Sequence, residues 1–252
     1  MLRDRLEYAW KTDVGRVRGR NEDAVAVLPD VGLVVVADGV GGANSGEVAS
    51  ALAADVIGGR FQRQTPPRGD AEKGRLFVEA AVEEANVAIW EHAQRHEACA
   101  GMVTTVVVGF AGRGWLAFAH VGDSRLYLLR EGDLTQLSRD HSFIQEVVDQ
   151  GFFRSLEEAK RYGINDNILT RALGTQIQAS ISSDVVETRP GDTFLFCTDG
   201  LTGMVPDTWL QKILTLGSGH DLDTVAASLV QVACERGGTD NITLALVRSG
   251  KH

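Results

Sequence analysis

The chain has 252 residues, of which 44% are apolar and 23% charged, and its formal net charge is −9. This composition is typical of a globular protein with a full core, and the acidic balance argues against a binder of nucleic acid or anionic membranes, which would present a basic face. The N-terminus lacks the apolar stretch of a signal peptide, and the longest apolar run, 31–37, is far shorter than the ~20 residues of a membrane helix. Three widely spaced cysteines are typical of buried thiols in a reducing compartment, so we expect a cytoplasmic protein.

The first predicted elements are a strand hairpin and two helices. Residues 25–28 and 32–37 are apolar strands separated by a Pro-Asp turn signal. Residues 47–61 carry apolar side chains at helical spacing, and residues 70–96 continue that pattern over a longer stretch. The chain therefore opens with a hairpin followed by a helix pair.

A second block is rich in strands. Residues 104–110, 115–121 and 125–130 are apolar, and the connectors between them have four and three residues. Connectors of this length are short enough for antiparallel neighbours. We therefore predict that these three strands lie side by side in one sheet.

Two late strands, 193–198 and 242–247, lie on either side of a predicted helix at 223–236, which ends at a Gly-Gly pair. Helices thus alternate with clusters of strands rather than with single strands. This order favours antiparallel sheets with helices packed outside them over a doubly wound parallel sheet. No stretch has the character of a domain linker, so we predict a single domain, 1–252. Residues 150–175 are polar and without period, which is typical of a functional or mobile excursion.

The clearest chemical signal is an apolar strand that ends in Asp-Gly, which occurs at Asp38-Gly39 and again at Asp199-Gly200. A buried strand that ends in a carboxylate delivers a charge to the end of a sheet, and the glycine lets the backbone turn sharply. Two such ends placed side by side would need a cation, because adjacent buried anions repel each other. A single Asp-Gly is more simply explained as a turn after a strand, and the second copy weakens that explanation.

Further acids lie at similar junctions, since Glu22, Asp23, Asp123 and Asp240 each stand close to an end of an apolar strand. Ligand sets made only of oxygen suit Mg²⁺ or Mn²⁺ rather than Zn²⁺, and the six histidines form no zinc motif. Arg18 places a guanidinium near the first acids, where it could bind phosphate through two parallel hydrogen bonds. On its own, an arginine in a basic stretch is more simply interpreted as a surface charge.

The glycine-rich stretch 39–46 follows a strand and precedes a helix, which is the setting of a phosphate-binding loop. The spacing does not fit the dinucleotide motif, because the third glycine would fall at Asn44. No Gly-Lys-Ser or Gly-Lys-Thr follows, which excludes a P-loop.

Taken in chain order, eight segments resemble the metal-dependent protein phosphatases, the type 2C family, and specifically their compact bacterial branch. The segments are 12–23, 37–42, 46–50, 104–105, 121–125, 137–142, 195–202 and 238–243. Each segment is short, but all eight occur in the family's order, and together they cover nearly the whole chain.

The resemblance implies an α+β fold, in which a central sandwich of two antiparallel β-sheets is flanked by helices on both sides (α-β-β-α). It places metals at one end of the sandwich and a flap at 150–175 beside them. By position, Asp38 would bridge two Mn²⁺ or Mg²⁺ ions, and the Gly39 carbonyl would bind one of them. Asp199 and Asp240 would bind the other ion.

The resemblance assigns roles to the remaining acids as well. Glu22 and Asp23 would bind the metals directly or through water, and Asp123 would support a third, weaker ion together with Asp199. Arg18 would bind the substrate phosphate, which a hydroxide bridging the metals would attack in line. The chain would then be a monomeric phosphatase of phosphoserine and phosphothreonine in proteins, opposing a bacterial serine/threonine kinase.

One departure from the family pattern concerns the general acid. Many relatives carry a histidine just after the Asp-Gly, but residues 40–46 contain none, and Ala43 occupies the slot used in several bacterial members. The general acid is unassigned, and a water on the third metal is our hypothesis. Two alternatives stay open at this point: a non-catalytic module that recognises phosphoproteins, and a phosphatase that regulates anti-sigma partner switching or a secretion apparatus.

Overall fold

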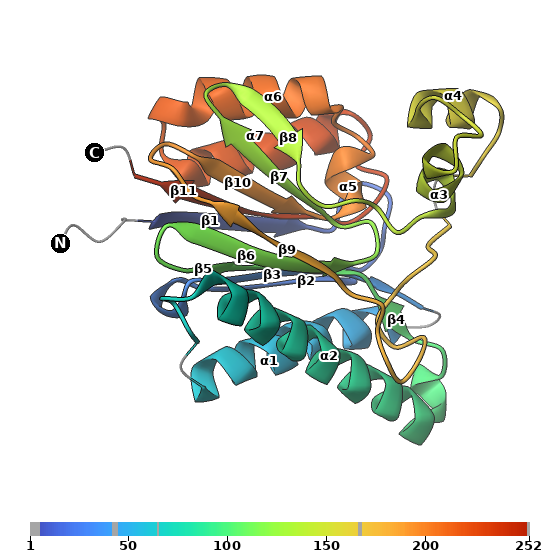
Figure 1. Ribbon diagram of the computed structural model, residues 1–252. Coiled ribbons are helices and arrows are strands. Elements are labelled where there is room, and N and C mark those ends of the chain that lie inside the picture. The colour runs from blue at the N-terminus through green and yellow to red at the C-terminus, as the bar shows by residue number, and fades with distance from the viewer. Residues whose placement is uncertain (1–5, 42–44, 65, 166–167, 251–252) are drawn as a thin grey trace.

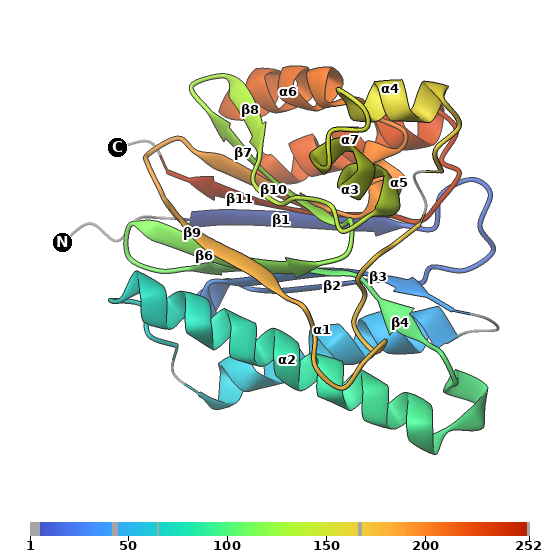
Figure 2. The same ribbon diagram turned by 45° about the vertical axis from the view of Figure 1, so that its right-hand side comes forward.

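Two antiparallel β-sheets lie face to face in the computed structural model, and helices cover the outer face of each sheet (Figures 1 and 2). The structure describes residues 6–41, 45–64, 66–165 and 168–250. The order of layers confirms the predicted α-β-β-α sandwich of the α+β class. Within these ranges, no helix combines the length and apolar character needed to cross a lipid bilayer.

The first sheet consists of five strands covered by two helices. Its strands are β1 (Leu6–Asp13), β7 (Arg125–Arg130), β8 (Asp133–Gln136), β10 (Thr193–Cys197) and β11 (Ile242–Ser249). They are arranged in the order β1-β11-β10-β7-β8. The covering helices are α6 (Asp207–Leu216) and α7 (Leu222–Glu235), at the top of Figure 1.

The second sheet packs against the other helix pair. Its strands are β2 (Asp23–Leu28), β3 (Leu33–Val40), β5 (Val106–Ala111), β6 (Trp115–Val121) and β9 (Ser182–Glu187), in the order β2-β3-β5-β6-β9. The short β4 (Val103–Thr104) pairs with the end of β3. The covering helices are α1 (Ser45–Arg63) and α2 (Ala71–Arg95), at the bottom of Figure 1.

Short helices complete the described chain. They are η1 (Pro29–Val31), η2 (Glu97–Cys99), α3 (Phe143–Asp149), α4 (Leu156–Arg161), α5 (Asp199–Thr202) and η3 (Gly217–Gly219). Among these, α5 follows β10 directly, so the second Asp-Gly pair forms the first turn of a helix rather than a plain loop.

Strands β3 and β10 lie inside their sheets and are buried on both faces, which explains their unbroken apolar sequences. Val35 packs with the helices outside its sheet, whereas Val34 and Val36 pack with Phe196 between the two sheets. A polar residue placed just after such a strand reaches the edge of the core without interrupting it. Asp199-Gly200 lies in this position after β10, whereas Asp38-Gly39 forms the last part of β3 itself, which runs on to Val40.

Several predicted elements are confirmed. Strand β2 pairs with β3 in an antiparallel hairpin, with Leu28 opposite Leu33. The helices predicted at 47–61, 70–96 and 223–236 correspond to α1, α2 and α7. Strands β1, β8 and β9 and helix α6 were not predicted; β1, for example, alternates partly buried and exposed residues and has only one fully buried position.

The prediction that 115–121 and 125–130 are antiparallel neighbours is wrong. Strand β6 pairs with β5 and β9, while β7 pairs with β10 and β8 in the other sheet. The turn 122–124 therefore carries the chain from one sheet to the other. A short connector after a buried strand fits either a hairpin or such a crossing, and only the long-range strand pairing decides between them.

The described parts of the flap, residues 150–165 and 168–175, begin at the end of α3 and return beside β4, where Leu173 pairs with Thr104. The N–H of Phe143 donates to the carbonyl of Ile168 (2.8 Å), and the N–H of Thr170 donates to the carbonyl of His141 (2.9 Å). These bonds tie the segment at the start of α3 to residues 168–170 of the flap. Figure 1 shows α3 and α4 to the right of the sheets, at the same end as α5.

Candidate metal centre

A cavity of about 830 Å³ opens at the end of the sandwich where α5 and the flap lie. The predicted site residues that line it are Arg18, Glu22, Asp38, Gly39, Asp123, Asp199 and Asp240. Asp23 is not among the lining residues, and its carboxylate accepts a hydrogen bond from the Thr198 hydroxyl (2.9 Å). Side chains from five separate stretches of sequence therefore meet at one place.

Asp38 stands where β3 changes partners. The strand pairs with β5 as far as Val36 and with β4 from Gly39 onward, so Asp38 lies between the two ladders. Its N–H donates to Thr105 Oγ1 (3.1 Å), and its carbonyl accepts from the Thr105 N–H (2.9 Å) and from the Thr104 hydroxyl (2.8 Å). The backbone of Asp38 is thus fully hydrogen-bonded, which fixes the direction of its carboxylate.

Gly39 allows a close approach of three chain segments. A Cβ at this position would lie 2.0 Å from the carbonyl oxygen of Gly46, in the first turn of α1, and 2.7 Å from that of Glu22. The N–H of Gly39 donates to the same Glu22 carbonyl (3.1 Å). Only glycine fits here, because any side chain would push α1 and the start of β2 away from Asp38.

Asp199 and Asp240 are brought together by a similar contact. A Cβ on Gly200 would lie 1.8 Å from the carbonyl oxygen of Asn241, so glycine lets α5 pack against the start of β11. One carboxylate oxygen of Asp199, Oδ1, is buried and has no hydrogen-bond partner among the described residues. A buried acceptor without a partner is costly and calls for an explanation.

Asn241 is a positioning residue that the sequence analysis did not single out. Its Oδ1 accepts from the Glu22 N–H (2.8 Å), and its Nδ2 donates to the carbonyls of Val14 (3.0 Å) and Arg20 (2.8 Å). The side chain is buried and ties the loop between β1 and β2, which carries Arg18, to the start of β11. In the sequence, Asn241 stands next to Asp240 in the last family segment, 238–243, and this position could have identified it.

Burial raises the pKa of four carboxyl groups in this centre. The pKa values of Asp23 and Asp123 rise to about 7, first through burial and further through the charge of Asp199. Burial, and after it the neighbouring Asp23, raise the pKa of Asp38 well above its ordinary value, and the Asp38 carboxyl is hydrogen-bonded to that of Asp199. The pKa of Asp199 is itself raised by burial and by Asp240. Each ionised group therefore destabilises the ionised form of the others.

These residues fit a hard divalent cation. Within the described ranges, no three acidic, histidine or cysteine side chains form a ready-made ligand cluster, since Asp38 and Asp199 bond to each other and Asp240 accepts from Arg18 (2.8 Å). The donors are nevertheless all oxygen, their charges repel, and Asp199 Oδ1 lacks a partner. A divalent cation would remove the repulsion and supply that partner, and oxygen donors select Mg²⁺ or Mn²⁺.

Two arginines bring positive charge to the cavity. Arg18 is paired with Asp240, but their side chains are 52% and 36% exposed, and an ion pair this open is worth only ~0–1 kcal/mol. The Arg18 guanidinium can therefore exchange its partner at little cost. Arg171, at the end of the flap, lines the same cavity; the sequence analysis assigned the flap to this place without naming that side chain.

No histidine of the described chain lines the cavity. His120 and His141 stack nearby with ring centres 4.6 Å apart, and burial lowers their pKa values to about 4 and about 3. The Gly122 N–H donates to His141 Nδ1 (3.1 Å), which requires that nitrogen to be unprotonated. Both rings are thus neutral near pH 7. Ala43, the slot of the missing histidine, lies outside the described residues.

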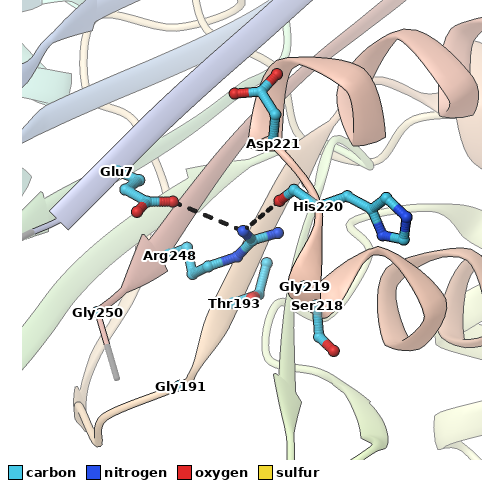
Figure 3. A pocket seen from close by; sticks show the side chains of 9 residues that line it. All are labelled: Glu7, Gly191, Thr193, Ser218, Gly219, His220, Asp221, Arg248 and Gly250. Carbon is cyan, nitrogen blue, oxygen red and sulfur yellow. Dashed lines mark hydrogen bonds and ion pairs between the residues drawn. The ribbon is translucent and has the colours of Figure 1, made fainter. Parts of the chain in front are cut away.

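A second hollow, of about 400 Å³, lies at the opposite ends of β10 and β11. Figure 3 shows Arg248 between Glu7 and the backbone of His220. Its guanidinium donates to the carbonyls of His220 (2.8 Å) and Gly217 (3.0 Å) and forms an ion pair with Glu7 (3.6 Å). The charge of Arg248 is committed to joining β11 to the loop before α7, so this hollow is a structural junction.

Comparison with known proteins agrees with this geometry. A family model described as protein phosphatase 2C matches residues 16–232. The serine/threonine phosphatase stp of Listeria welshimeri is 36% identical over 245 residues, which cover 96% of this chain and 95% of that protein. The crystal structure of the Mycobacterium tuberculosis serine/threonine phosphatase PstP/Ppp superposes with a TM-score of 0.86 at 33% identity, covering 98% of this chain and 99% of that one. A structure of the PstP catalytic domain in complex with two manganese ions gives 0.83 at 34% identity, with coverage of 98% and 99%.

An α-β-β-α sandwich with an oxygen-lined, carboxylate-rich end is the architecture of a metal-dependent phosphatase. The chain belongs to the protein phosphatase 2C family and is a metal-dependent serine/threonine phosphatase.

Proposed function

We propose that Asp38 is shared between two Mn²⁺ or Mg²⁺ ions, with the Gly39 carbonyl on one ion and with Asp199 and Asp240 on the other. The observation that carries this proposal is the buried, partnerless Oδ1 of Asp199 among carboxyls whose pKa values are raised by burial and by neighbouring acids. The two manganese ions in the PstP catalytic domain, 34% identical to this chain, support the same number and kind of ion.

We also propose a third, weaker ion held by Asp123 with Asp199. Asp123 lines the cavity from the turn that crosses between the sheets, and the charge of Asp199 raises its pKa. Glu22 lines the cavity, while Asp23 lies behind it on Thr198. This placement suits contact with the ions for Glu22 and a more distant, orienting role for Asp23.

The chain's own residues prepare the phosphate for reaction. Divalent cations in this centre supply Lewis-acid stabilisation of the phosphoryl oxygens and an activated water. Arg18 exchanges Asp240 for the phosphate and donates two parallel hydrogen bonds to it. Arg171 adds positive charge from the flap side of the cavity. The neutral His120 and His141 rings donate no proton to the leaving oxygen, so the general acid comes from outside the histidines of the described chain.

The proposed substrates are phosphoserine and phosphothreonine in proteins, including a serine/threonine kinase or its targets, whose phosphorylation the enzyme reverses. The cavity opens at the end of the sandwich, so a phosphorylated side chain enters it while the rest of the partner stays outside. We further propose that the chain acts as a monomer and as one domain.

A binding and turnover experiment tests the centre. Calorimetric titration of Mn²⁺ is compared for the wild type, Asp38→Asn and Asp199→Asn, with Asp133→Asn, an exposed residue of β8, as the control. We expect both centre variants to lose Mn²⁺ sites and the control to keep them. EDTA should abolish phosphate release from a phosphothreonine peptide. Unchanged Mn²⁺ binding by Asp199→Asn would sink the proposed centre, and Mn²⁺ binding without turnover of any phosphopeptide would favour the non-catalytic module.

A further inference from the structure

One side of the cavity mouth is formed by Met204 and Thr239. The Thr239 hydroxyl donates to the Met204 sulfur (3.7 Å), which joins the segment between α5 and α6 to the loop that follows α7. The chain leads from this contact to Trp209, in the first turn of α6, and to Arg236, at the C-terminal end of α7, whose neighbour Gly237 would place a Cβ 3.5 Å from the Met204 sulfur. The surface next to the mouth is therefore built from the adjoining ends of two helices.

An exposed aromatic ring lies close to two cations on this surface. Trp209 is 45% exposed. The Arg236 guanidinium carbon lies 4.6 Å from the centre of its ring, and the Lys212 ammonium lies 5.4 Å from the same centre. Both distances are in the range of cation–π contacts. Arg16 lies alongside, because its N–H donates to the Gly238 carbonyl (2.7 Å) and its side chain packs against Gly238.

These cations differ from most others in the protein. Arg75, Arg125, Arg130 and Arg139 each bind a carboxylate. In contrast, no ion pair to a described carboxylate is formed by Arg16, Lys212 or Arg236. The C-terminal end of α7 favours a cation such as Arg236 through the helix dipole, but this effect accounts neither for Lys212 nor for an exposed tryptophan.

We propose that Arg16, Trp209, Lys212 and Arg236, here called the basic rim, bind acidic residues that flank the phosphorylated serine or threonine of protein substrates. This inference rests on the proposed function. A phosphorylated side chain in the cavity leaves its neighbouring residues at the mouth, where Met204 and Thr239 lead directly onto the rim. Carboxylates there meet cations that are not already paired with a described carboxylate, in a chain whose net charge of −9 otherwise repels them. The rim thus selects acidic substrates in spite of the protein's overall charge.

The test uses two phosphothreonine peptides that differ only in carrying Glu or Gln at the flanking positions. Steady-state kinetics with Mn²⁺ are measured for the wild type, Arg236→Glu and a matched control, Arg113→Glu. Arg113 is also exposed, but it lies in the turn between β5 and β6, at the far end of those strands. Hydrolysis of p-nitrophenyl phosphate, which has no flanking residues, reports on the centre alone.

We expect the wild type to prefer the acidic peptide by about 10-fold in kcat/KM, since two or more exposed charge pairs, each worth up to ~1 kcal/mol, together reach the ~1.4 kcal/mol that changes affinity tenfold. Arg236→Glu should remove this preference through KM and leave turnover of p-nitrophenyl phosphate and of the Gln peptide unchanged. Arg113→Glu should behave as the wild type, and high salt should weaken the preference. Equal rates for the two peptides in the wild type would overturn the rim, as would a fall in p-nitrophenyl phosphate turnover in Arg236→Glu. If the proposed metal centre were wrong, the wild type would instead hydrolyse neither the Glu peptide, nor the Gln peptide, nor p-nitrophenyl phosphate.

Discussion

Strand β10 has a buried aspartate, Asp192, just before its first residue and a half-buried one, Asp199, just after its end, and their surroundings differ completely. Asp192 is 1% exposed. Its two carboxylate oxygens accept from Arg130 Nε (2.9 Å) and Nη2 (2.7 Å), and one of them also accepts from the Arg189 N–H (2.7 Å). Asp199 has one oxygen without a partner among the described residues, and burial and the neighbouring Asp240 raise its pKa.

The contrast separates a structural carboxylate from one that is set up for a ligand. At Asp192 the protein supplies its own cation and hydrogen bonds, so the charge is compensated within the fold. At Asp199 the protein gathers further negative charge and leaves the compensation to something it binds. A buried acid therefore indicates a binding site only when the protein itself does not supply the cations and hydrogen-bond donors that compensate its charge.

The largest expected effect is on activity at the ligand-binding end. Asp199→Asn should lower Mn²⁺-dependent phosphate release by about 10²- to 10³-fold, because electrostatic stabilisation of the transition state usually makes the largest contribution to catalysis. Its unfolding midpoint in EDTA should stay equal to that of the wild type or rise, since a repelled buried charge has been removed. Urea denaturation and phosphate-release assays measure the two effects. A marked loss of stability in EDTA would place Asp199 in the same class as Asp192.

The converse is expected at the other end of the strand. Asp192→Asn should destabilise the fold by about 3 kcal/mol, because it leaves the Arg130 charge without its buried partner. The specific activity of the folded fraction should remain near that of the wild type. Urea denaturation measures the loss of stability, and a separate phosphate-release assay at low temperature, where the variant stays folded, measures the specific activity. A selective loss of turnover with unchanged stability would contradict the structural role.

The pH dependence of Mn²⁺ stabilisation sharpens the comparison. The pKa values of Asp23 and Asp123 are raised to about 7 in the metal-free fold from an ordinary 3.8. Between these values the native state holds more protons than the unfolded chain, so the metal-free stability falls as the pH rises. His120 and His141 have lowered pKa values and act in the opposite direction, losing stability as the pH falls below about 6.5.

The histidine contribution cancels when Mn²⁺-loaded and EDTA-treated protein are compared at each pH. The stabilisation by Mn²⁺ should therefore grow by on the order of a few kcal/mol from about pH 5 to about pH 7.5, since one pKa unit corresponds to about 1.4 kcal/mol. Thermal unfolding at fixed free Mn²⁺ measures it. A stabilisation that is independent of pH would mean that the carboxyls are already ionised without the metal.

The smallest expected effect concerns Arg18. Arg18→Ala should lower kcat/KM for phosphopeptides by about 10- to 100-fold through the loss of a charge-assisted phosphate contact. Its stability should change by less than ~1 kcal/mol, because the ion pair with Asp240 is largely exposed. Steady-state kinetics of Arg18→Ala and Arg18→Lys measure the effect on phosphopeptide hydrolysis, and urea denaturation of the same variants measures the effect on stability. A lysine that restored full activity would show that charge alone, without the two-pronged geometry of arginine, is sufficient.

Much of the architecture could be predicted from local pattern. The unbroken apolar sequences of β3 and β10, the hairpin of β2 and β3, and the helices α1, α2 and α7 follow from periodicity and turn residues. The ordered family segments predicted the sandwich and the residues Asp38, Asp199 and Asp240, whose roles stay predictions. The edge strands β1 and β8 were not predicted. Their residues alternate between partly buried and exposed positions, so their sequences are as polar as those of loops.

The sequence by itself determined which residue types stand at the ends of buried strands, and therefore that the chemistry is that of oxygen ligands and divalent cations. It did not determine which of those residues meet. The crossing from β6 to β7 that brings in Asp123, the hold of Asn241 on the loop carrying Arg18, and the basic rim all depend on segments far apart in the chain. Gly191-Asp192 and Asp199-Gly200 have much the same local character, yet only one of these acids has its charge compensated by the fold. The reason is physical: the free energy of a buried charge depends on the partners around it, and only the tertiary structure supplies or withholds them.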